Sequence, residues 1–570
     1  MAISGGHLLA RLMIRAGIRN VYGVAGGALG PLLHAIGDQP ELRYLGTRHE
    51  AAGALMATAA FQSTGSPAVC LAEQGPGTHN LIAGLGSARA NNLAVLAITV
   101  SGDSAHSFPA RGALMQLDAV AALRPLTKWS TGIHDPRRLP EAFRTALRQA
   151  LSGTPGPVHL DIPRDVLTAM ADEGEADGGD LALPQEAYRP ARPSVADPVA
   201  VAYAAALLAQ ARRPLLIAGG GAAASGADMP FRRLIGLLEA PATATQSGLG
   251  VVADDDPAFI GHGGVIGGPA VIRAMREADV VLAVGCRFSS WLWQEGTPIV
   301  RGEPHQRLIQ IDVEPSVIGR ARPVSLGLVG DAAAVLGQLG DALRKEQKLP
   351  DRADWLASLR DDYMTHLAEL DKLAADTSGV MHPAALAKAL AEAMPQDSLV
   401  VYDGGHTSFW SNSFMPVAFS RTRFHEAGMA QLGFGLPYAN ALAALHPAKT
   451  IVHITGDGSI GFTLQELDTA RRYGLRAIHV IHNNEAWGVI RASQRHAGFE
   501  LGTRLEGTDY AAIARGFGCH GERVETWDEL APAIDRALAT ELPAVLDVRV
   551  RFEPHPMFPA FGAALRRPAR

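Results

Sequence analysis

The sequence has few of the features that mark a secreted protein, a membrane protein or a cysteine-based metal site. Its three cysteines, Cys70, Cys286 and Cys519, lie far apart without C-x-x-C spacing, so neither a thiolate zinc site nor a disulfide framework is expected. The apolar runs are short and interrupted by glycine, proline or charge, and the first residues lack the long uncharged run of a signal peptide. We therefore expect a soluble protein in the reducing cytoplasm.

A strong excess of charge of one sign is also lacking. The net charge is −6 and the isoelectric point is near 6.4, so nothing attracts the whole chain to nucleic acid or to an anionic membrane. Apolar residues are abundant instead, at 47% against 19% charged residues, which suits buried sheets covered by helices and argues against extensive disorder. At 570 residues the chain is too long for a single hydrophobic core.

Strand and helix signals alternate along the chain, which predicts an α/β protein with parallel sheets. We divide the sequence into three doubly wound domains in series, at residues 1–170, 198–343 and 381–553. A linker without periodicity at 171–197, a polar helical connector at 344–380 and a tail at 554–570 complete the chain. The strongest strand signals lie at residues 68–71, 93–100, 158–162, 215–218, 280–284, 308–311, 399–402, 450–454, 477–481 and 544–548.

The segment from residue 451 to 488 carries the clearest chemical signal. A strand leads into a Gly-Asp-Gly-Ser turn and an amphipathic helix, and a second strand then leads to two asparagines. Because parallel strands end at the same edge of a sheet, Asp457 and Asn484 can converge there, and their oxygens suit Mg²⁺ or Ca²⁺. The glycines allow close approach of a phosphate to the backbone. The segment predicts a metal-bridged diphosphate ligand, although ordinary strand–turn–helix units also contain such glycine-rich corners.

This turn, followed at this spacing by paired asparagines, resembles the cofactor motif of thiamin-diphosphate-dependent enzymes. In that family the aspartate, the second asparagine and a backbone carbonyl two residues later hold magnesium. The resemblance therefore implies Asp457, Asn484 and Ala486 as metal ligands. The turn residues that it implies in cofactor binding are Gly456, Asp457, Gly458 and Ser459.

A second motif lies far upstream, where residues 42–45 predict a strand that leads into a helix beginning with Glu50. Stabilisation by the helix dipole would by itself explain a carboxylate at that place. Members of the family, however, place a glutamate in the same Arg-His-Glu context against the pyrimidine N1′ of the cofactor bound by the neighbouring subunit. The resemblance implies this catalytic role for Glu50. Protonation at N1′ favours the 4′-imino tautomer, which removes the C2 proton to give the ylide.

The Gly-Phe-Gly-Leu-Pro string at residues 433–437 resembles the family segment beneath the bent cofactor. By this resemblance Leu432 separates the two cofactor rings and the carbonyl of Ala430 accepts from the 4′-amino group, while His406 and Thr407 flank the diphosphate. Periodicity alone would describe the segment as a buried helix start. The resemblance extends over nearly the whole chain, and it implies pyrimidine-binding, central and diphosphate-binding domains and a homodimer or homotetramer.

The likeness is strongest to the group of acetolactate synthase, benzaldehyde lyase and benzoylformate decarboxylase, yet the expected pocket differs from all three. Ala28 stands where benzaldehyde lyase has a histidine, and Leu114 where it has a glutamine, with Gln116 two places later. Trp487 and Ile490 complete the candidate substrate pocket. No single named activity is therefore transferred intact.

The leading hypothesis is a magnesium- and thiamin-diphosphate-dependent lyase or carboligase that acts on small 2-oxo acids or aldehydes through an enamine. One alternative is an acyl-CoA enzyme, either a 2-hydroxyacyl-CoA lyase or a relative of oxalyl-CoA decarboxylase, which the arginines of the C-terminal tail favour. The other is a cofactor-binding subunit without turnover, against which the intact Glu50, Asp457 and Asn484 argue. Neither nucleic acid nor a membrane is expected as a partner.

The central domain contains a glycine-rich turn within residues 215–226 that invites a dinucleotide interpretation. A single such turn is weak support for a nucleotide site. Arg287 and Asp312 stand where acetolactate synthases contact FAD and where acyl-CoA relatives bind ADP groups, but the same positions are compatible with a structural role. Bound FAD or ADP is therefore the less favoured interpretation.

Overall fold

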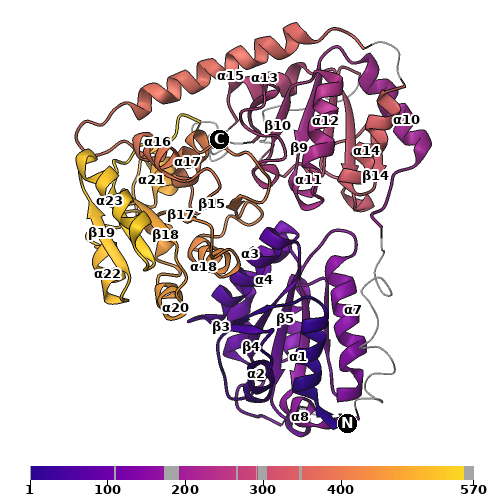
Figure 1. Ribbon diagram of the computed structural model, residues 1–570, viewed down its shortest axis with the longest axis vertical. Helices are drawn as coiled ribbons and strands as arrows, with labels where there is room; N and C mark the ends of the chain where they lie inside the picture. Colours follow the sequence, from indigo (N-terminus) through magenta and orange to yellow (C-terminus); the bar gives the residue numbers. More distant parts are fainter. Residues whose placement is uncertain are drawn as a thin grey trace.

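A computed structural model describes residues 2–107, 111–172, 192–264, 267–289, 292, 304–345 and 349–557. Each of the three expected domains contains a six-stranded sheet in which all paired strands are parallel, with helices on both faces (Figure 1). This confirms the predicted α/β architecture. None of the helices in the described residues combines the length and the apolar character that crossing a membrane requires.

The N-terminal sheet has the order β3-β2-β4-β5-β7-β6. Its strands are β2 (Asn20–Gly23), β3 (Arg43–Gly46), β4 (Ala68–Glu73), β5 (Val95–Ser101), β6 (Trp129–Gly132) and β7 (Val158–Pro163). The helices are α1 (Gly5–Arg15), α2 (Gly30–Gly37), α3 (Glu50–Thr64), α4 (Pro76–Asn91), α5 (Ser104–Ser107), α6 (Ala119–Leu123), α7 (Leu139–Leu151) and α8 (Arg164–Thr168). As predicted, the helix after β3 begins at Glu50.

The central sheet has the order β11-β10-β9-β12-β13-β14. Its strands are β9 (Pro214–Ala218), β10 (Ala242–Ala244), β11 (Phe259–His262), β12 (Val280–Val284), β13 (Arg307–Asp312) and β14 (Leu326–Val329). The helices are α10 (Pro198–Gln210), α11 (Gly220–Ala224), α12 (Asp228–Leu238), α13 (Pro269–Glu277) and α14 (Ala332–Leu343). Counted along the domain, this is the strand order 3-2-1-4-5-6 that many dinucleotide-binding domains share.

The C-terminal sheet has the order β16-β15-β17-β18-β20-β19, which repeats the topology of the N-terminal sheet. Its strands are β15 (Leu399–Tyr402), β16 (Arg423–His425), β17 (Ile451–Gly456), β18 (Ile478–Asn483), β19 (His520–Val524) and β20 (Ala544–Arg549). The helices are α16 (Pro383–Ala393), α17 (His406–Phe414), α18 (Gly435–Leu445), α19 (Asp457–Ile460), α20 (Glu466–Tyr473), α21 (Gly488–His496), α22 (Tyr510–Gly516) and α23 (Trp527–Ala539).

Two expectations about local structure need correction. The single amphipathic helix expected after the Gly-Asp-Gly turn is two short helices, α19 and α20, and α19 begins at Asp457 itself. The linker expected from residue 171 starts later, because β8 (Met170–Asp172) pairs with β1 (Ala2–Ser4) and belongs to the first domain. Most strands without a strong sequence signal lie at sheet edges, where strands are short and one side faces solvent. Residues 173–191 of the linker and 558–570 of the tail lie outside the described residues.

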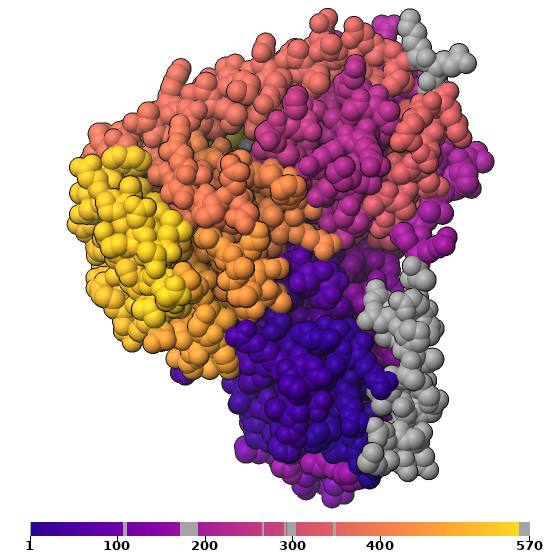
Figure 2. Space-filling model, in the orientation of Figure 1, coloured from indigo at the N-terminus to yellow at the C-terminus, as the bar shows by residue number. Residues whose placement is uncertain are grey.

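The first and third domains share a hydrophobic core. Helices α3 and α4 contribute Leu55 and Leu85 to it, and α18 contributes Tyr438 and Leu442 from the other side. Figure 1 shows α18 beside α3, and the two domains meet along this seam in Figure 2. The long connector helix α15 (Ala353–Ala374) contacts α13 of the central domain and α16 of the third. The seam therefore fixes the relative position of the two terminal domains within one chain.

Arg352, directly before α15, is a buried arginine whose side chain caps the C-terminal ends of two helices of the central domain. Only 1% of its surface is exposed. Its guanidinium donates to the carbonyl of Leu238 at the end of α12 (2.7 Å) and to those of Leu208 (2.7 Å) and Ala211 (2.9 Å) at the end of α10. These carbonyls have no partner within their own helices, so one side chain satisfies two helix ends at once.

We expect Arg352→Met to destabilise the central domain by about 2 to 4 kcal/mol, because it leaves several buried carbonyls without donors while keeping the apolar stem. Urea unfolding and hydrogen exchange at the ends of α10 and α12 would measure the loss. The control is Arg344→Met, which removes an exposed arginine paired with Asp341 and should change stability by about 0.5 kcal/mol or less. Equal effects of the two changes would contradict this role for Arg352.

Candidate functional site

Three loops converge where β15, β17 and β18 end, because these adjacent parallel strands present their carboxyl ends at one edge. A Cβ atom added to Gly404 would lie 2.9 Å from Oγ of Ser459, and one added to Gly456 would lie 3.3 Å from Oγ1 of Thr407. The β15–α17 loop and the Gly-Asp-Gly-Ser turn are therefore in contact. Only residues without side chains fit at the two glycine positions unless the neighbours move.

The third loop brings His406 and Asn484 to the same place. A Cβ atom added to Gly488 would lie 3.1 Å from the His406 ring and 3.3 Å from Nδ2 of Asn484. Burial lowers the pKa of His406 to about 4, so its imidazole is neutral at pH 7. Trp487 covers the turn, because a Cβ atom on Gly458 would lie 2.6 Å from the indole. His406, Thr407, Ser459 and Asn484 thus lie close together in the structure. These are residues that the resemblance assigns to the diphosphate and its metal.

Asp457 and Asn484 have the properties of a cation site. The Asp457 carboxylate is 3% exposed and accepts from the backbone N–H groups of Gly458 (3.0 Å) and Ala486 (2.9 Å). Burial raises the pKa of Asp457 to about 7. The buried side-chain oxygen of Asn484 has no hydrogen-bond partner among the described residues. A buried carboxylate and an unsatisfied amide oxygen on two loops in contact form a donor set that a hard divalent cation would complete, so the residues present fit the metal-bridged diphosphate.

The loop before α18 is held against this corner by Asp403. Its carboxylate accepts from the N–H groups of Gly433 (3.2 Å) and Gly435 (3.1 Å), and Thr463 donates to the carbonyl of Gly433 (2.7 Å). The position of Leu432, directly before Gly433, is therefore set from two sides. Asp403 was not indicated by the sequence, although it adjoins the Gly-Gly-His-Thr string.

Ala430 adopts a left-handed backbone conformation with φ of 53°, which is uncommon for a residue with a side chain. The buried carboxylate of Glu426 supports it by accepting from the N–H groups on either side, those of Met429 (3.0 Å) and Gln431 (2.8 Å). Glu426 also accepts from Ser87 of α4 across the seam between the terminal domains (3.3 Å). The conformation that presents the Ala430 carbonyl thus depends on a contact between the first and third domains.

The N-terminal domain carries a second group of candidate residues. Glu50 accepts a hydrogen bond from the side chain of Asn80 (2.9 Å), a partner that the sequence did not reveal although Asn80 lies within the Gly-Pro-Gly-Thr-His-Asn string. Glu73, at the end of β4, accepts from the backbone N–H groups of Gly27 (3.1 Å) and Ala28 (2.8 Å). A Cβ atom on Gly77 would lie within 4 Å of both carboxylate side chains. Glu50, Glu73 and Ala28 are therefore neighbours.

The remaining pocket candidates differ in their surroundings. Leu114 is 83% exposed, and its carbonyl accepts from the side chain of Gln74 (3.2 Å). Gln116 is turned back onto its own loop, where its oxygen accepts from Gly112 (2.9 Å) and Ala113 (3.1 Å). Ile490 is 52% exposed on α21. Leu114 and Ile490 are therefore apolar side chains on the surface of the single chain.

The two groups of candidate residues lie on different domains, Glu50 on α3 of the first and Asp457 on α19 of the third. Among the described residues, no hydrogen bond or ion pair connects Glu50 with Asp457 or Asn484. Besides the seam between α3 and α18, the first domain contacts the third through α20.

The contact through α20 involves the loop that leads into Glu50. The buried carboxylate of Glu466 accepts from the backbone N–H of Arg48 (3.1 Å) and from the hydroxyl of Thr469 (2.6 Å). Tyr473 accepts from the N–H of Gly46 (2.8 Å). The third domain therefore sets the position of the residues directly before Glu50 in its own chain.

We expect Glu466→Gln to change how stability depends on pH. Burial raises the pKa of Glu466 from 4.5 to about 7, so the folded protein holds this proton more tightly than the unfolded chain. The contribution of Glu466 to stability is therefore greatest below pH 4.5 and is lost as the pH rises to about 7, by up to about 3 kcal/mol. Thermal unfolding of wild type and variant between pH 5 and pH 8 would measure the difference. The exposed Glu541 supplies the control, since Glu541→Gln should leave the pH profile unchanged.

The glycine-rich turn after β9 in the central domain packs closely against another part of the backbone. A Cβ atom on Gly219 would lie 2.2 Å from the carbonyl oxygen of Gly285, and one on Gly221 would lie 2.7 Å from Cα of Gly285. The turn after β9 therefore needs glycine in order to fit against the turn after β12. Arg287 donates to the carbonyl of Ala90 in the first domain (2.6 Å), and Asp312 accepts from the N–H of Glu314 (3.0 Å). These residues thus have structural partners independent of any nucleotide.

Comparisons with known proteins agree with this arrangement. Thiamine pyrophosphate (TPP) is another name for thiamin diphosphate. Three domains of the thiamine pyrophosphate enzymes match the chain: the N-terminal TPP binding domain at residues 3–122, the central domain at 201–339 and the C-terminal TPP binding domain at 403–548. A probable acetolactate synthase large subunit from Methanocaldococcus jannaschii is 30% identical over 577 residues, covering 98% of this chain and 94% of that protein. The acetolactate synthase isozyme 2 large subunit of Escherichia coli is 30% identical over 556 residues, covering 96% of each. The chain belongs to the thiamine-pyrophosphate-dependent enzymes.

Proposed function

We propose that the protein is a magnesium-dependent carboligase or lyase that joins or cleaves a carbon–carbon bond beside the carbonyl of a small 2-oxo acid or aldehyde. The observation that carries the proposal is the buried Asp457 carboxylate, which accepts from Ala486 on the loop that also carries the unsatisfied oxygen of Asn484, at the sheet edge where the diphosphate would lie. Similarity along nearly the whole length to proteins named acetolactate synthase supports a 2-oxo acid as the donor substrate.

Each group of residues has a task in this proposal. Asp457, Asn484 and the carbonyl of Ala486 hold Mg²⁺, while the turn and the His406–Thr407 pair bind the diphosphate. Leu432 and the carbonyl of Ala430 orient the two rings. When bound, the cofactor supplies a carbon nucleophile that can also accept the negative charge released from the substrate. Glu50, positioned by Asn80, holds a proton at the pyrimidine nitrogen.

We further propose that the working assembly is at least a homodimer, either a dimer or a tetramer. The support is that Glu50 and the Asp457 corner lie on different domains, on α3 and α19, and that no hydrogen bond or ion pair joins them among the described residues. The cytoplasm stays our proposed location, which suits the three free cysteines. Light scattering of the active enzyme should report two or four chains, and a fully active monomer would contradict this assembly.

A product assay tests the proposed reaction. We expect the protein loaded with Mg²⁺ and thiamin diphosphate to release carbon dioxide from pyruvate or another 2-oxo acid and to join the remaining acyl unit to an aldehyde or a second 2-oxo acid, giving a 2-hydroxy ketone or a 2-hydroxy-3-oxo acid. Benzaldehyde, phenylglyoxylate and a 2-hydroxyacyl-CoA serve as competing substrates in the same panel. Turnover of the acyl-CoA alone would replace the proposal with the acyl-CoA alternative, and turnover of none would favour a subunit without catalysis.

A further inference from the structure

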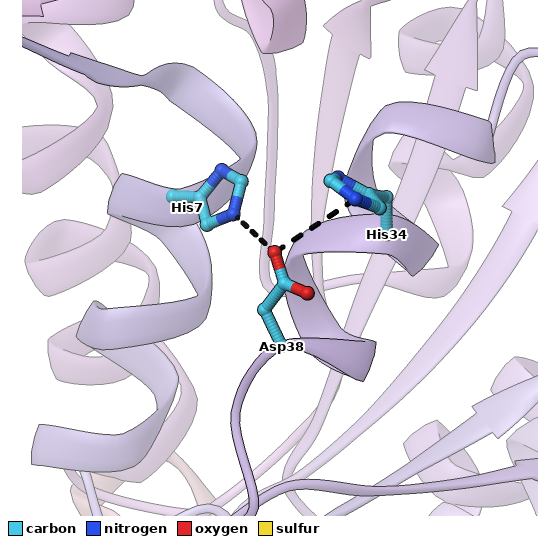
Figure 3. A group of neighbouring side chains, drawn as sticks. All are labelled: His7, His34 and Asp38. Atoms are coloured by element: carbon cyan, nitrogen blue, oxygen red, sulfur yellow. Dashed lines mark hydrogen bonds and ion pairs between the residues drawn. The ribbon is translucent and has the colours of Figure 1, made fainter.

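A group of possible metal ligands lies on the surface of the N-terminal domain, away from the candidate cofactor site. His7 is on α1, His34 is in the last turn of α2, and Asp38 is the residue at which α2 ends. Nε2 of His7 lies 2.9 Å from Oδ2 of Asp38, and Nε2 of His34 lies 3.8 Å from the same oxygen. One ligand atom from each residue lies within 4.8 Å of the other two, and Figure 3 shows the carboxylate between the two rings.

The ring of His7 is oriented by the cap of its own helix. Ser4 is the N-cap of α1, where its hydroxyl accepts from the backbone N–H of His7 (3.3 Å) and also bonds to Nδ1 of the His7 ring (2.8 Å). Histidines that bind metals usually have the other ring nitrogen fixed in this way. His34 and Asp38 are four residues apart, so both point from one face of α2 toward α1.

The separations are close to those that a small metal ion requires. Zinc bonds of about 2.0 to 2.2 Å in a tetrahedral arrangement place the ligand atoms about 3.3 Å apart. The separations of 2.9 and 3.8 Å between the histidine nitrogens and Oδ2 of Asp38 lie on either side of this value. The His34 side chain is 74% exposed, so its ring can rotate toward the other ligands without disturbing the core.

The contact between His7 and Asp38 is a hydrogen bond that needs a proton between the two atoms. Two lone pairs would repel each other at 2.9 Å, so a proton must lie between Nε2 and the carboxylate oxygen when no metal does. A divalent ion can replace that proton while keeping both side chains in place. It would also take His34, whose ring faces His7 edge-on with centroids 5.8 Å apart, into the same coordination shell.

We propose that His7, His34 and Asp38 bind a divalent transition metal such as Zn²⁺, with solvent in the fourth position. Two imidazoles and one carboxylate favour zinc, cobalt or nickel over magnesium and calcium, whereas the corner at Asp457 and Asn484 offers only oxygen ligands. The bound ion ties α1 to the end of α2. Because α2 follows the loop that contains Ala28, the ion stabilises the part of the first domain that carries this candidate pocket residue.

The test is metal binding by the full-length protein without thiamin diphosphate, after removal of bound metal. Co²⁺ is followed by its visible absorption, and Zn²⁺ by competition with a coloured chelator. Wild type should bind one Co²⁺ per chain, displaced by Zn²⁺, while His34→Ala and Asp38→Asn should bind about tenfold more weakly or worse. His305→Ala removes an exposed histidine of the central domain and should bind as wild type does.

Further measurements separate this site from other causes. Asp457→Asn should keep the Co²⁺ signal, since that signal does not depend on the cofactor corner. Zn²⁺ should raise the Tm of wild type and of His305→Ala but not that of His34→Ala, because only binding to the folded protein stabilises it. Binding or stabilisation that is the same in wild type, His34→Ala and Asp38→Asn would overturn the proposal.

Discussion

Glu50→Gln should slow hydrogen–deuterium exchange at C2 of the bound cofactor by a factor of about 10² to 10⁴, while the protein still folds and binds the cofactor. The carboxylate is needed to hold a proton at the pyrimidine nitrogen, and an amide cannot exchange that proton. The fold should survive because a glutamine oxygen can still accept from Asn80, as the Glu50 carboxylate does at 2.9 Å.

The measurement is acid quenching of the loaded enzyme in deuterated buffer, followed by NMR of the released cofactor. Glu41→Gln is the matched control, because Glu41 is exposed in the same domain, and it should exchange at the wild-type rate. Asn80→Ala should give a smaller loss than Glu50→Gln, since it removes only the group that positions the carboxylate. Wild-type exchange in Glu50→Gln would make Glu50 a structural residue.

Asp457→Asn should instead weaken binding of the cofactor, by about 100-fold or more in the presence of Mg²⁺. The change removes the one negative charge of the metal corner, while an asparagine oxygen can still accept from the N–H of Ala486, as Asp457 does at 2.9 Å. High concentrations of Mg²⁺ and thiamin diphosphate should partly restore activity. This rescue separates a binding defect from the chemical defect of Glu50→Gln.

Thermal shift gives the readout, with and without EDTA. Wild type should be stabilised by thiamin diphosphate only when a divalent ion is present, and the variant should need far more cofactor for the same shift. Asp468→Asn, on nearby α20 and paired with Arg472, should respond as wild type does. Equal stabilisation of wild type with and without EDTA would remove the metal bridge from the proposal.

The two variants together test how the site is divided between chains. If Glu50 of one chain works with Asp457 of another, a dimer made of one Glu50→Gln chain and one Asp457→Asn chain contains one intact site and one doubly altered site. Coexpression should then restore up to about half the activity of wild type per hybrid dimer. A site built within a single chain would leave both sites altered, and the hybrid would be as inactive as its parents.

The sequence by itself determined the elements and the cofactor class. Buried parallel strands are nearly continuous apolar runs, so β12 and β15 were predicted with the bounds that the structure has. The Gly-Asp-Gly turn and Asn484 were proposed as a diphosphate and metal site because they follow two neighbouring strands at a spacing that resembles the family's cofactor motif. Edge strands such as β6 and β19 were not evident, because they are short and polar.

The tertiary structure alone decided which distant residues support the site. Several supporting side chains form hydrogen bonds with groups that are remote in the sequence or separated by a turn: those of Asn80, Asp403, Glu426 and Glu466. No periodic sequence pattern predicts such pairs. A glycine-rich turn has the same sequence whether it packs against a phosphate or against another backbone turn. In the central domain, the close approach of Gly285 to Gly219 and Gly221 shows that the turn after β9 packs against backbone. Local patterns follow from the repeat of one helix or strand, whereas these contacts arise only after the domains have packed.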